Sequence, residues 1–309
     1  MDERATRLDR VTLTSLTWGD IDDQDRPLAV LLHGFPDTAH TWRHLGPALA
    51  AAGHRVVAPF TRGYAPSGIP ADGSFHVPAL MDDALALHRA YDGDDRAVLV
   101  GHDWGAITAN GIAACEANPF RSVVALAVPP FPAMGPRRDD LGGWLRILPR
   151  QVRMSWYTLF NQAPLLPERT FDRVVAPLWR RWSPGYDARV DLAHLADALR
   201  DQAHRSAALG YYRAQPRPWA LPAHYRPLAR DWTGAPRIPV LYLHGADDGW
   251  TSAGVLGSLI VGRTMEDFMP PRYRRRHAEA IRRRRGLGEA FTARVVELSA
   301  LRADGCEVP

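Results

Sequence analysis

The chain has 309 residues, of which 46% are hydrophobic and 23% are charged. This composition is ordinary for a globular protein and excludes a disordered, collagen-like or coiled-coil chain. No run of about 18 apolar residues occurs, so we expect no membrane-spanning helix. The first residues lack the apolar stretch of a signal peptide, and two cysteines cannot build a disulfide framework. We therefore expect a cytoplasmic protein with one large α/β domain or two smaller ones.

All 38 positively charged residues are arginine, and the formal net charge is +4. Residues 261–309 hold 11 Arg against 7 Asp and Glu, a surplus of +4, so residues 1–260 are neutral. A nucleic-acid-binding protein usually spreads basic residues over one face of its fold, so we expect no nucleic-acid partner. The arginine-rich segment is atypical of a folded core. A frameshifted gene end and a solvated basic helix are both open interpretations of it.

Hydrophobic periodicity predicts alternating strands and helices in the first part of the chain. We expect strands at residues 11–18, 28–32, 55–60, 96–100 and 122–128. We expect helices at residues 41–52, 77–91 and 104–118, where apolar side chains recur with helical spacing. The first strand alternates apolar and polar residues, which indicates an edge strand. This order of elements predicts a mostly parallel sheet with helices on both faces.

The rhythm changes at residues 131–237, which are rich in Pro, Trp, Tyr and Arg and show mostly helical periodicity, as at 190–209. A strand returns only at residues 239–244. We therefore expect a helical segment inserted between two strands of one sheet. The predicted division is a core of residues 1–130 and 238–309 and a helical insertion of residues 131–237.

The most informative stretch is Val98-Leu-Val-Gly-His-Asp-Trp-Gly-Ala, in which a buried strand runs through a tight turn into a helix. This is the context of a nucleophile elbow, where strained backbone presents one side chain at a helix N-terminus. Gly101 and Gly105 remove Cβ atoms that would clash there. The residue presented is Asp103 instead of serine. Alternatively, Asp103 is an ordinary helix N-cap.

An aspartate at this position predicts a particular reaction. A carboxylate is a poor nucleophile toward esters, but it can displace a leaving group at saturated carbon and form an alkyl-enzyme ester. Water then attacks the ester carbonyl and regenerates the carboxylate. The second step builds an oxyanion, which needs backbone donors nearby. The N–H groups of Phe35 and Trp104 are the candidates.

Four motifs occur together: His33-Gly-Phe-Pro, Arg62-Gly-Tyr, Gly101-His-Asp-Trp-Gly and Gly245-Ala-Asp-Asp. With them the chain resembles the α/β-hydrolase fold over roughly residues 10–260, and specifically its epoxide hydrolase and haloalkane dehalogenase branch. The resemblance implies that the helical insertion is a lid over the active site. It also implies that no cofactor takes part.

The lid distinguishes epoxides from halides as substrates. An opened epoxide leaves an alkoxide that needs a proton, which phenol hydroxyls can supply, whereas a departing halide needs N–H donors. The resemblance implies that Tyr157 and Tyr212 are the lid tyrosines of an epoxide hydrolase. Tyr211 is the neighbour most easily confused with Tyr212. Phe35 also fits epoxide hydrolases better, because dehalogenases tend to carry a polar side chain there.

The base that activates water should be a histidine oriented by a late acid. The resemblance implies Asp248 as the acid, with Asp247 as the alternative. His277 is the only histidine after Asp248 and lies 29 residues beyond it. Its surroundings are arginine-rich, unlike the glycine and aromatic context of the family, so its role stays open.

The remaining histidines are weaker candidates for the base. We expect His33 to order the oxyanion loop and His102 to pack under the elbow, while His40 and His44 could be surface residues. No set of His, Cys, Asp and Glu has the spacing of metal ligands.

The sequence therefore predicts a hydrolase that opens a small or medium apolar epoxide to a vicinal diol with water and without cofactor or metal. The alternatives are a haloalkane dehalogenase and a degenerate hydrolase that binds apolar ligands without turnover. The oligomeric state stays open.

Overall fold

The computed structural model describes residues 1–134, 145, 149 and 152–243. Within them the chain forms a seven-stranded sheet in the order β1-β2-β4-β3-β5-β6-β7. Strands β1 and β2 run antiparallel to their neighbours, and the other pairs are parallel. The strands are β1 Asp2–Arg7, β2 Thr12–Trp18, β3 Leu28–Leu32, β4 Arg55–Pro59, β5 Val98–His102, β6 Ser122–Leu126 and β7 Val240–Leu243.

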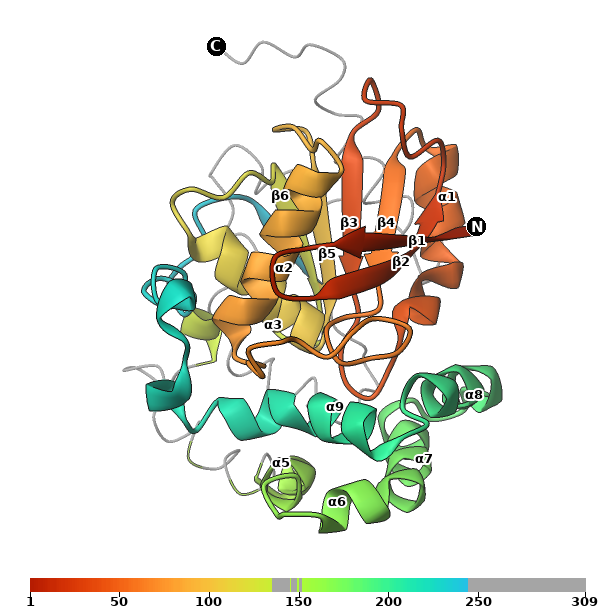
Figure 1. The fold of residues 1–309 in the computed structure, drawn as a ribbon, viewed down its shortest axis with the longest axis vertical. Coiled ribbons are helices and arrows are strands. Elements are labelled where there is room, and N and C mark those ends of the chain that lie inside the picture. Colours follow the sequence, from red (N-terminus) through yellow and green to blue (C-terminus); the bar gives the residue numbers. More distant parts are fainter. Residues whose placement is uncertain (135–144, 146–148, 150–151, 244–309) are drawn as a thin grey trace.

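Helices cover both faces of this sheet, as the sequence predicts. In the part of the core that the structure describes, the helices are η1 Ala39–Arg43, α1 Leu45–Ala51, α2 Val77–Ala90, α3 Trp104–Ala114 and η2 Phe131–Ala133. Helix α1 lies on one face of the sheet, so close to β2 that a Cβ on Gly46 would lie 2.5 Å from the ring of Trp18. Leu13, on the opposite face of the same strand, lines a cavity with Leu80 and Leu87 of α2. Helices α2 and α3 lie side by side on that second face (Figure 1).

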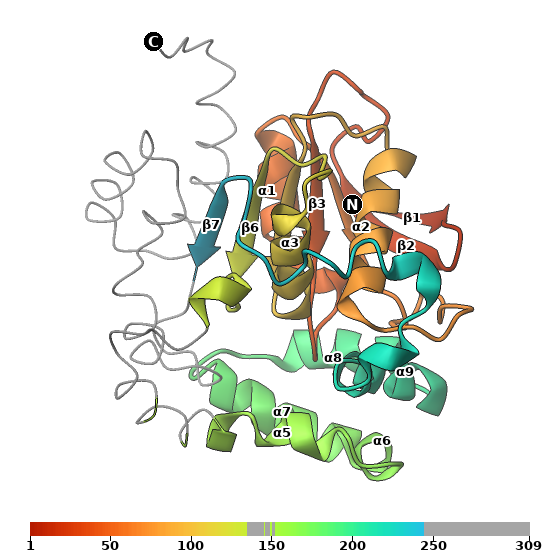
Figure 2. The same cartoon turned by 90° about the vertical axis from the view of Figure 1, so that its left-hand side faces the viewer.

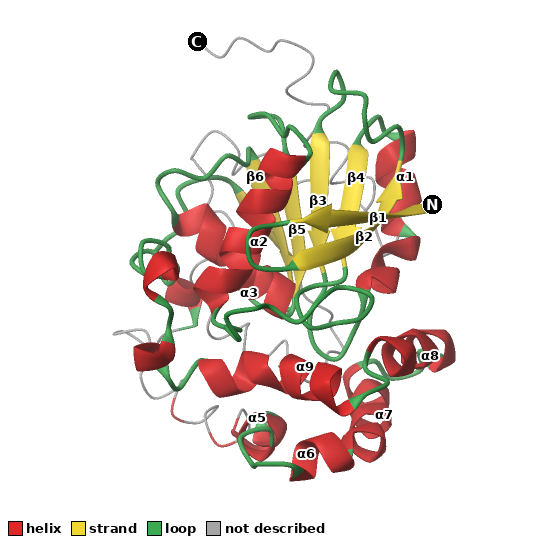
Figure 3. Ribbon diagram, viewed as in Figure 1, coloured by secondary structure: helices red, strands yellow, loops and turns green. Residues whose placement is uncertain are grey.

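A second group of helices connects β6 to β7. Among the described residues its members are α5 Trp156–Phe160, α6 Leu166–Arg169, α7 Phe171–Trp182, α8 Arg189–Ala198, α9 Gln202–Ala214, η3 Pro218–Ala220 and η4 Ala223–Tyr225. Helices α5–α9, here called the α5–α9 layer, gather at one end of the sheet (Figure 3). The arrowheads of β6 and β7 point toward that end (Figure 2). The layer therefore lies beyond the carboxyl ends of the parallel strands, where open α/β sheets bind ligands. The division into core and lid domains stays a prediction.

Several boundaries differ from those predicted. The strand predicted as an edge is not one, because β1 pairs with β2 along its length and β2 also pairs with β4. The sequence misses β1 because its side chains are exposed on both faces and show no apolar alternation. The stretch of helical periodicity at 190–209 is divided between α8 and α9. Helix α9 begins at Gln202, after the N-cap Asp201, whose side chain accepts from the N–H of His204. None of the described helices is long and apolar enough to span a membrane.

A buried ion pair joins the loop after β4 to α2. The guanidinium of Arg62 is inaccessible to solvent and donates to both carboxylate oxygens of Asp83, at 2.6 and 2.7 Å. It also donates to the carbonyl oxygens of Ser74 and Ala79. With these partners the buried charge is compensated, and the arginine fastens three chain segments together.

Loss of one partner of this ion pair should therefore destabilise the folded protein strongly. We expect Asp83→Asn to lower the free energy of unfolding by about 3–5 kcal/mol, because the Arg62 charge would remain buried without its counter-ion. Urea unfolding followed by circular dichroism measures this. The matched control is Asp187→Asn, which breaks an exposed pair with Arg189 and should leave the midpoint unchanged. Equal effects of the two substitutions would contradict the assignment.

Candidate active site

The turn between β5 and α3 holds Asp103 in a strained conformation. Its φ of 51° and ψ of −113° lie outside the regions favoured by non-glycine residues. The turn is possible because its flanking residues are glycines: a Cβ on Gly101 would lie 2.1 Å from the carbonyl oxygen of Gly105, and a Cβ on Gly105 would lie 2.1 Å from that of Leu32. Asp103 occupies the N-cap position of α3, but its side chain makes no capping hydrogen bond to that helix.

The carboxylate of Asp103 meets the loop that follows β3. The N–H of Phe35 donates to Oδ1 of Asp103 over 2.7 Å. Gly34 permits this approach, because a Cβ there would lie 2.4 Å from both the Cβ and Oδ1 of Asp103. The Phe35 amide is thus aimed at one carboxylate oxygen, where a developing negative charge would be stabilised.

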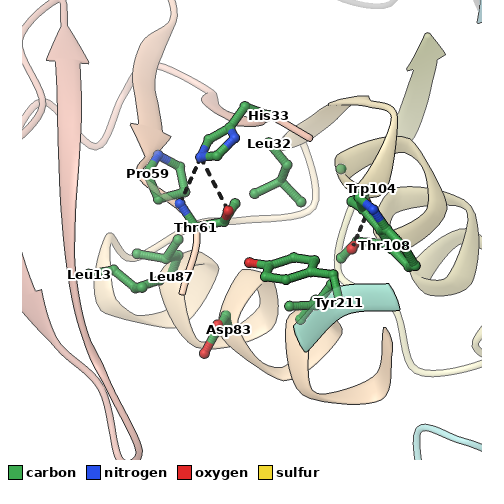
Figure 4. Close-up of a pocket in the computed structure, with 12 residues that line it drawn as sticks. Leu13, Leu32, His33, Pro59, Thr61, Asp83, Leu87, Trp104, Thr108 and Tyr211 are labelled. Atoms are coloured by element: carbon green, nitrogen blue, oxygen red, sulfur yellow. Dashed lines mark hydrogen bonds between the residues drawn. The ribbon is translucent and has the colours of Figure 1, made fainter. Parts of the chain in front are cut away.

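His33 orders this loop. The N–H of Thr61 donates to Nε2 of His33 over 3.0 Å (Figure 4). Because an amide can only donate, Nε2 is unprotonated and Nδ1 carries the proton, which it donates to the carbonyl oxygen of Gly34. Burial lowers the pKa of His33 to about 4. The ring is therefore a neutral, fixed support for the loop.

Aromatic side chains from the α5–α9 layer lie against the elbow. The ring of Tyr212 makes edge contacts with Phe35, Trp104 and Tyr157, with centroids 5.0, 5.1 and 5.7 Å away. Both tyrosines are buried. Burial raises the pKa of Tyr212, and the nearby Tyr157 and Asp103 raise it further, so its proton is retained at neutral pH. Its hydroxyl has no hydrogen-bond partner among the described residues.

The structure also separates Tyr212 from its neighbour. The hydroxyl of Tyr211 donates to the carbonyl oxygen of Arg62 over 2.9 Å. Its ring packs against Tyr64, Phe75 and Trp104. Tyr211 is thus held in a packing role, and Tyr212 is the residue whose hydroxyl is available near the elbow.

A small cavity of about 20 Å³ lies beneath the elbow, between the sheet, α2 and α9 (Figure 4). Its lining includes His33, Thr61, Trp104 and Tyr211 but not Asp103, Tyr157 or Tyr212. A space of this size holds about one water molecule. It is a packing gap behind the site and not a substrate pocket.

The water-activating base and its acid stay predictions, since Asp247, Asp248 and His277 lie outside the described residues. The two described histidines next to the elbow and the oxyanion loop, His102 and His33, fit poorly as bases because both are buried and their pKa is lowered. Burial lowers the pKa of His102, the residue before Asp103, to about 4. His44 is exposed as expected.

His40 differs from the expected surface residue, because it is partly buried and stacks on His194 with centroids 3.7 Å apart. Burial, followed by the neighbouring His194, lowers the pKa of His40 to about 4. Within the described part of the chain, no cluster of three or more His, Cys, Asp or Glu side chains could hold a metal ion.

One long-range contact at the site follows from no pattern in the sequence. Nε1 of Trp179 on α7 donates to the carbonyl oxygen of Pro36 over 2.9 Å. The two residues are 143 positions apart. A single tryptophan in a helix rich in aromatic and basic residues gave no indication of this contact.

A family model describing the alpha/beta hydrolase fold matches residues 27–260. Epoxide hydrolase A of Mycobacterium tuberculosis is 34% identical over 183 residues, which cover 53% of this chain and 55% of that protein. An epoxide hydrolase of Caballeronia sordidicola is 44% identical over 104 residues, covering 33% and 31%. The chain thus matches about a third to a half of the length of these relatives.

Solved structures extend the similarity over most of the chain. Epoxide hydrolase VrEH1 from Vigna radiata has a TM-score of 0.66 and 25% identity, with 87% of each chain covered. Epoxide hydrolase A from Mycobacterium thermoresistibile has a TM-score of 0.57 and 27% identity, covering 79% of this chain and 82% of that one.

Backbone strain at Asp103 predicts an inverted order of stability between two substitutions. Asp103→Gly and Asp103→Ala both lose the bond to Phe35, so their difference reports the backbone alone. We expect the glycine variant to be more stable by about 1–3 kcal/mol, whereas in regular structure alanine is favoured. Urea unfolding of the two variants measures the difference. An alanine variant that is equally or more stable would show that the elbow is not strained.

The histidines of the site predict acid sensitivity. The folded pKa of both His33 and His102 is about 4, below the ordinary 6.5. Below pH 6.5 the unfolded chain therefore binds protons that the folded chain rejects, and the free energy of unfolding should fall as pH decreases from 6.5 to 4. Urea midpoints at pH 7 and pH 5 measure this fall. His102→Gln should flatten the dependence, because it removes one of the two groups; an unchanged slope would contradict the assignment.

Proposed function

The chain belongs to the alpha/beta hydrolase fold family, and we propose that it opens a small or medium-sized apolar epoxide to a vicinal diol. The observation that carries the proposal is the carboxylate of Asp103, presented by a strained elbow and held by the N–H of Phe35. The buried Tyr212 near this carboxylate, with Tyr157 packed against its ring, adds a proton source. The epoxide hydrolases among the similar proteins support the same substrate class.

In the first step, the carboxylate oxygen that Phe35 does not bind attacks an epoxide carbon. A bond forms between that oxygen and the carbon while the carbon–oxygen bond of the epoxide breaks. The product is an alkyl ester of Asp103 with an alkoxide on the adjacent carbon. Attack in line is favoured because the elbow fixes the direction of the nucleophile.

The alkoxide receives its proton from the lid tyrosines. Tyr212 is suited to this role because its raised pKa keeps it protonated and its hydroxyl has no partner among the described residues. Tyr157 packs edge-on against Tyr212, so a second hydroxyl comes from a different helix of the same layer. Two donors from two helices can hold one epoxide oxygen from both sides.

In the second step, water attacks the carbonyl carbon of the ester. Negative charge develops on the carbonyl oxygen, which the N–H groups of Phe35 and Trp104 stabilise. We assign His277 as the base that takes the proton of this water and Asp248 as the acid that orients it. Collapse of the intermediate breaks the bond to the diol oxygen, which takes the proton from His277. The carboxyl group formed on Asp103 returns its proton to the tyrosinate, so the carboxylate, the base and the tyrosines are restored and the reaction consumes only epoxide and water.

The surroundings of the site complete the proposal. Residues 131–237 act as the lid that carries Tyr157 and Tyr212 and excludes bulk water from the ester. The aromatic rings around the carboxylate make the site apolar, which favours an uncharged substrate. The cytoplasm stays the proposed compartment, since two cysteines cannot build a disulfide framework.

The direct test is diol formation from styrene oxide, measured by chromatography. We expect the wild type to form diol and Asp103→Ala to form none. Tyr212→Phe should lower the rate by about 100-fold or more, because the alkoxide loses a proton donor. The matched control is Tyr211→Phe, which changes the adjacent tyrosine on the same helix and should keep most of the activity.

Other outcomes separate the alternatives. Full activity of Asp103→Ala would refute the nucleophile. Bromide release from 1-bromobutane without diol from styrene oxide would identify a haloalkane dehalogenase. An adduct on Asp103 that persists in the intact mass, without turnover, would identify a degenerate hydrolase.

A further inference from the structure

The oxyanion loop, residues 33–37, is held from two sides. On the side of the sheet, His33 and Thr61 fix its beginning. On the side of the α5–α9 layer, Nε1 of Trp179 donates to the carbonyl oxygen of Pro36 over 2.9 Å. Phe35, whose N–H reaches Asp103, lies between these two attachments.

Trp179 is itself fixed in place. Its ring stacks on Tyr186, with centroids 6.3 Å apart and an angle of 26° between the planes. The hydroxyl of Tyr186 donates to Oδ2 of Asp191 over 2.7 Å. Arg43 donates to both carboxylate oxygens of Asp191, at 2.5 and 3.2 Å, and to the hydroxyl of Tyr186 at 3.0 Å. Asp191 is only 3% exposed, so this ion pair is shielded from solvent on one side.

These contacts form a closed ring that begins and ends at the oxyanion loop. Arg43 belongs to η1, which follows the oxyanion loop directly, while Asp191 belongs to α8 and Trp179 to α7. Contacts therefore connect the oxyanion loop to α8 through the Arg43–Asp191 pair, and α8 to Trp179 of α7 through Tyr186. The bond from Trp179 to Pro36 leads back to the same loop. The position of the loop is thereby coupled to the α5–α9 layer.

We propose that Trp179 is a positioning residue that holds the N–H of Phe35 in place for hydrolysis of the alkyl-enzyme ester, an inference that rests on the proposed function. Trp179 acts through the Pro36 carbonyl, and Tyr186 braces its ring. The two chemical steps use the Phe35 N–H differently. During alkylation the carboxylate loses charge, so a donor to it does not stabilise the transition state. During hydrolysis charge develops on the ester oxygen, so a well-placed donor lowers the barrier.

Loss of the indole donor should therefore slow the second step selectively. Trp179→Phe keeps an aromatic ring over Tyr186 but removes the N–H. With styrene oxide, rapid quench followed by intact mass measures formation and decay of the adduct. We expect the decay rate to fall at least about tenfold, since small misplacements of catalytic groups have effects of this order. The formation rate should stay unchanged, so the adduct accumulates and kcat and KM fall together.

Two further variants complete the test. Trp219→Phe is the matched control, because Trp219 is 77% exposed and its loss of an indole N–H should change neither rate. Tyr186→Phe removes the hydroxyl that anchors the brace and should slow adduct decay in the same direction but by less. Since Tyr186 is 49% exposed, Tyr186→Phe should fold. If Trp179→Phe does not fold, the rate of adduct decay in Tyr186→Phe tests the inference.

The opposite result is equally clear. A structural role for Trp179 would loosen the layer and slow adduct formation, with KM raised and the adduct fraction lowered; that pattern overturns the inference. Unchanged decay in the folded variant overturns it too. A wild type that forms neither adduct nor diol refutes the proposed function itself, whereas a normal wild type beside an unaltered Trp179→Phe refutes the inference alone.

Discussion

The site depends on one contact, the hydrogen bond from the N–H of Phe35 to Oδ1 of Asp103. It requires two segments far apart in the sequence to approach without intervening side-chain atoms, which Gly34 permits. It also requires strained backbone at Asp103, a cost that packing around the elbow must offset. The parallel order of β3 and β5 brings both segments to the same edge of the sheet. The fold is in this sense the frame that holds one carboxylate against one amide.

Much of this frame could be predicted from local patterns. The buried strand β3 is a continuous apolar run, and β4 has the apolar centre Val56-Val-Ala. The turn around Asp103 carries the two glycines that its close approaches demand. Strand β1 could not be predicted, because its charged side chains are exposed and only its pairing with β2 makes it a strand. Hydrophobic periodicity does not reveal the break between α8 and α9 before Asp201, since one helix can end and another begin without any change in apolar spacing.

Candidate site residues could be predicted where they belong to a short sequence motif. Contacts between residues far apart in the sequence could not. The resemblance implies Tyr157 and Tyr212, and in the structure Tyr212 lies near Asp103 while Tyr157 packs against the ring of Tyr212. Tyr211 and Tyr212 differ by one position on α9, and only their contacts distinguish a fixed hydroxyl from an available one. The bond from Trp179 to Pro36 has no sequence pattern at all, because an indole N–H can reach any nearby carbonyl.

The central claim is that Asp103 forms a covalent bond to substrate, and oxygen isotopes test it most directly. With enzyme in excess over styrene oxide in H₂¹⁸O, a single turnover should give diol that contains no ¹⁸O, because its new oxygen comes from the carboxylate. The label should then appear in the peptide that contains Asp103. If the diol of that first turnover carries ¹⁸O and the peptide does not, water attacks the epoxide directly and the account is wrong.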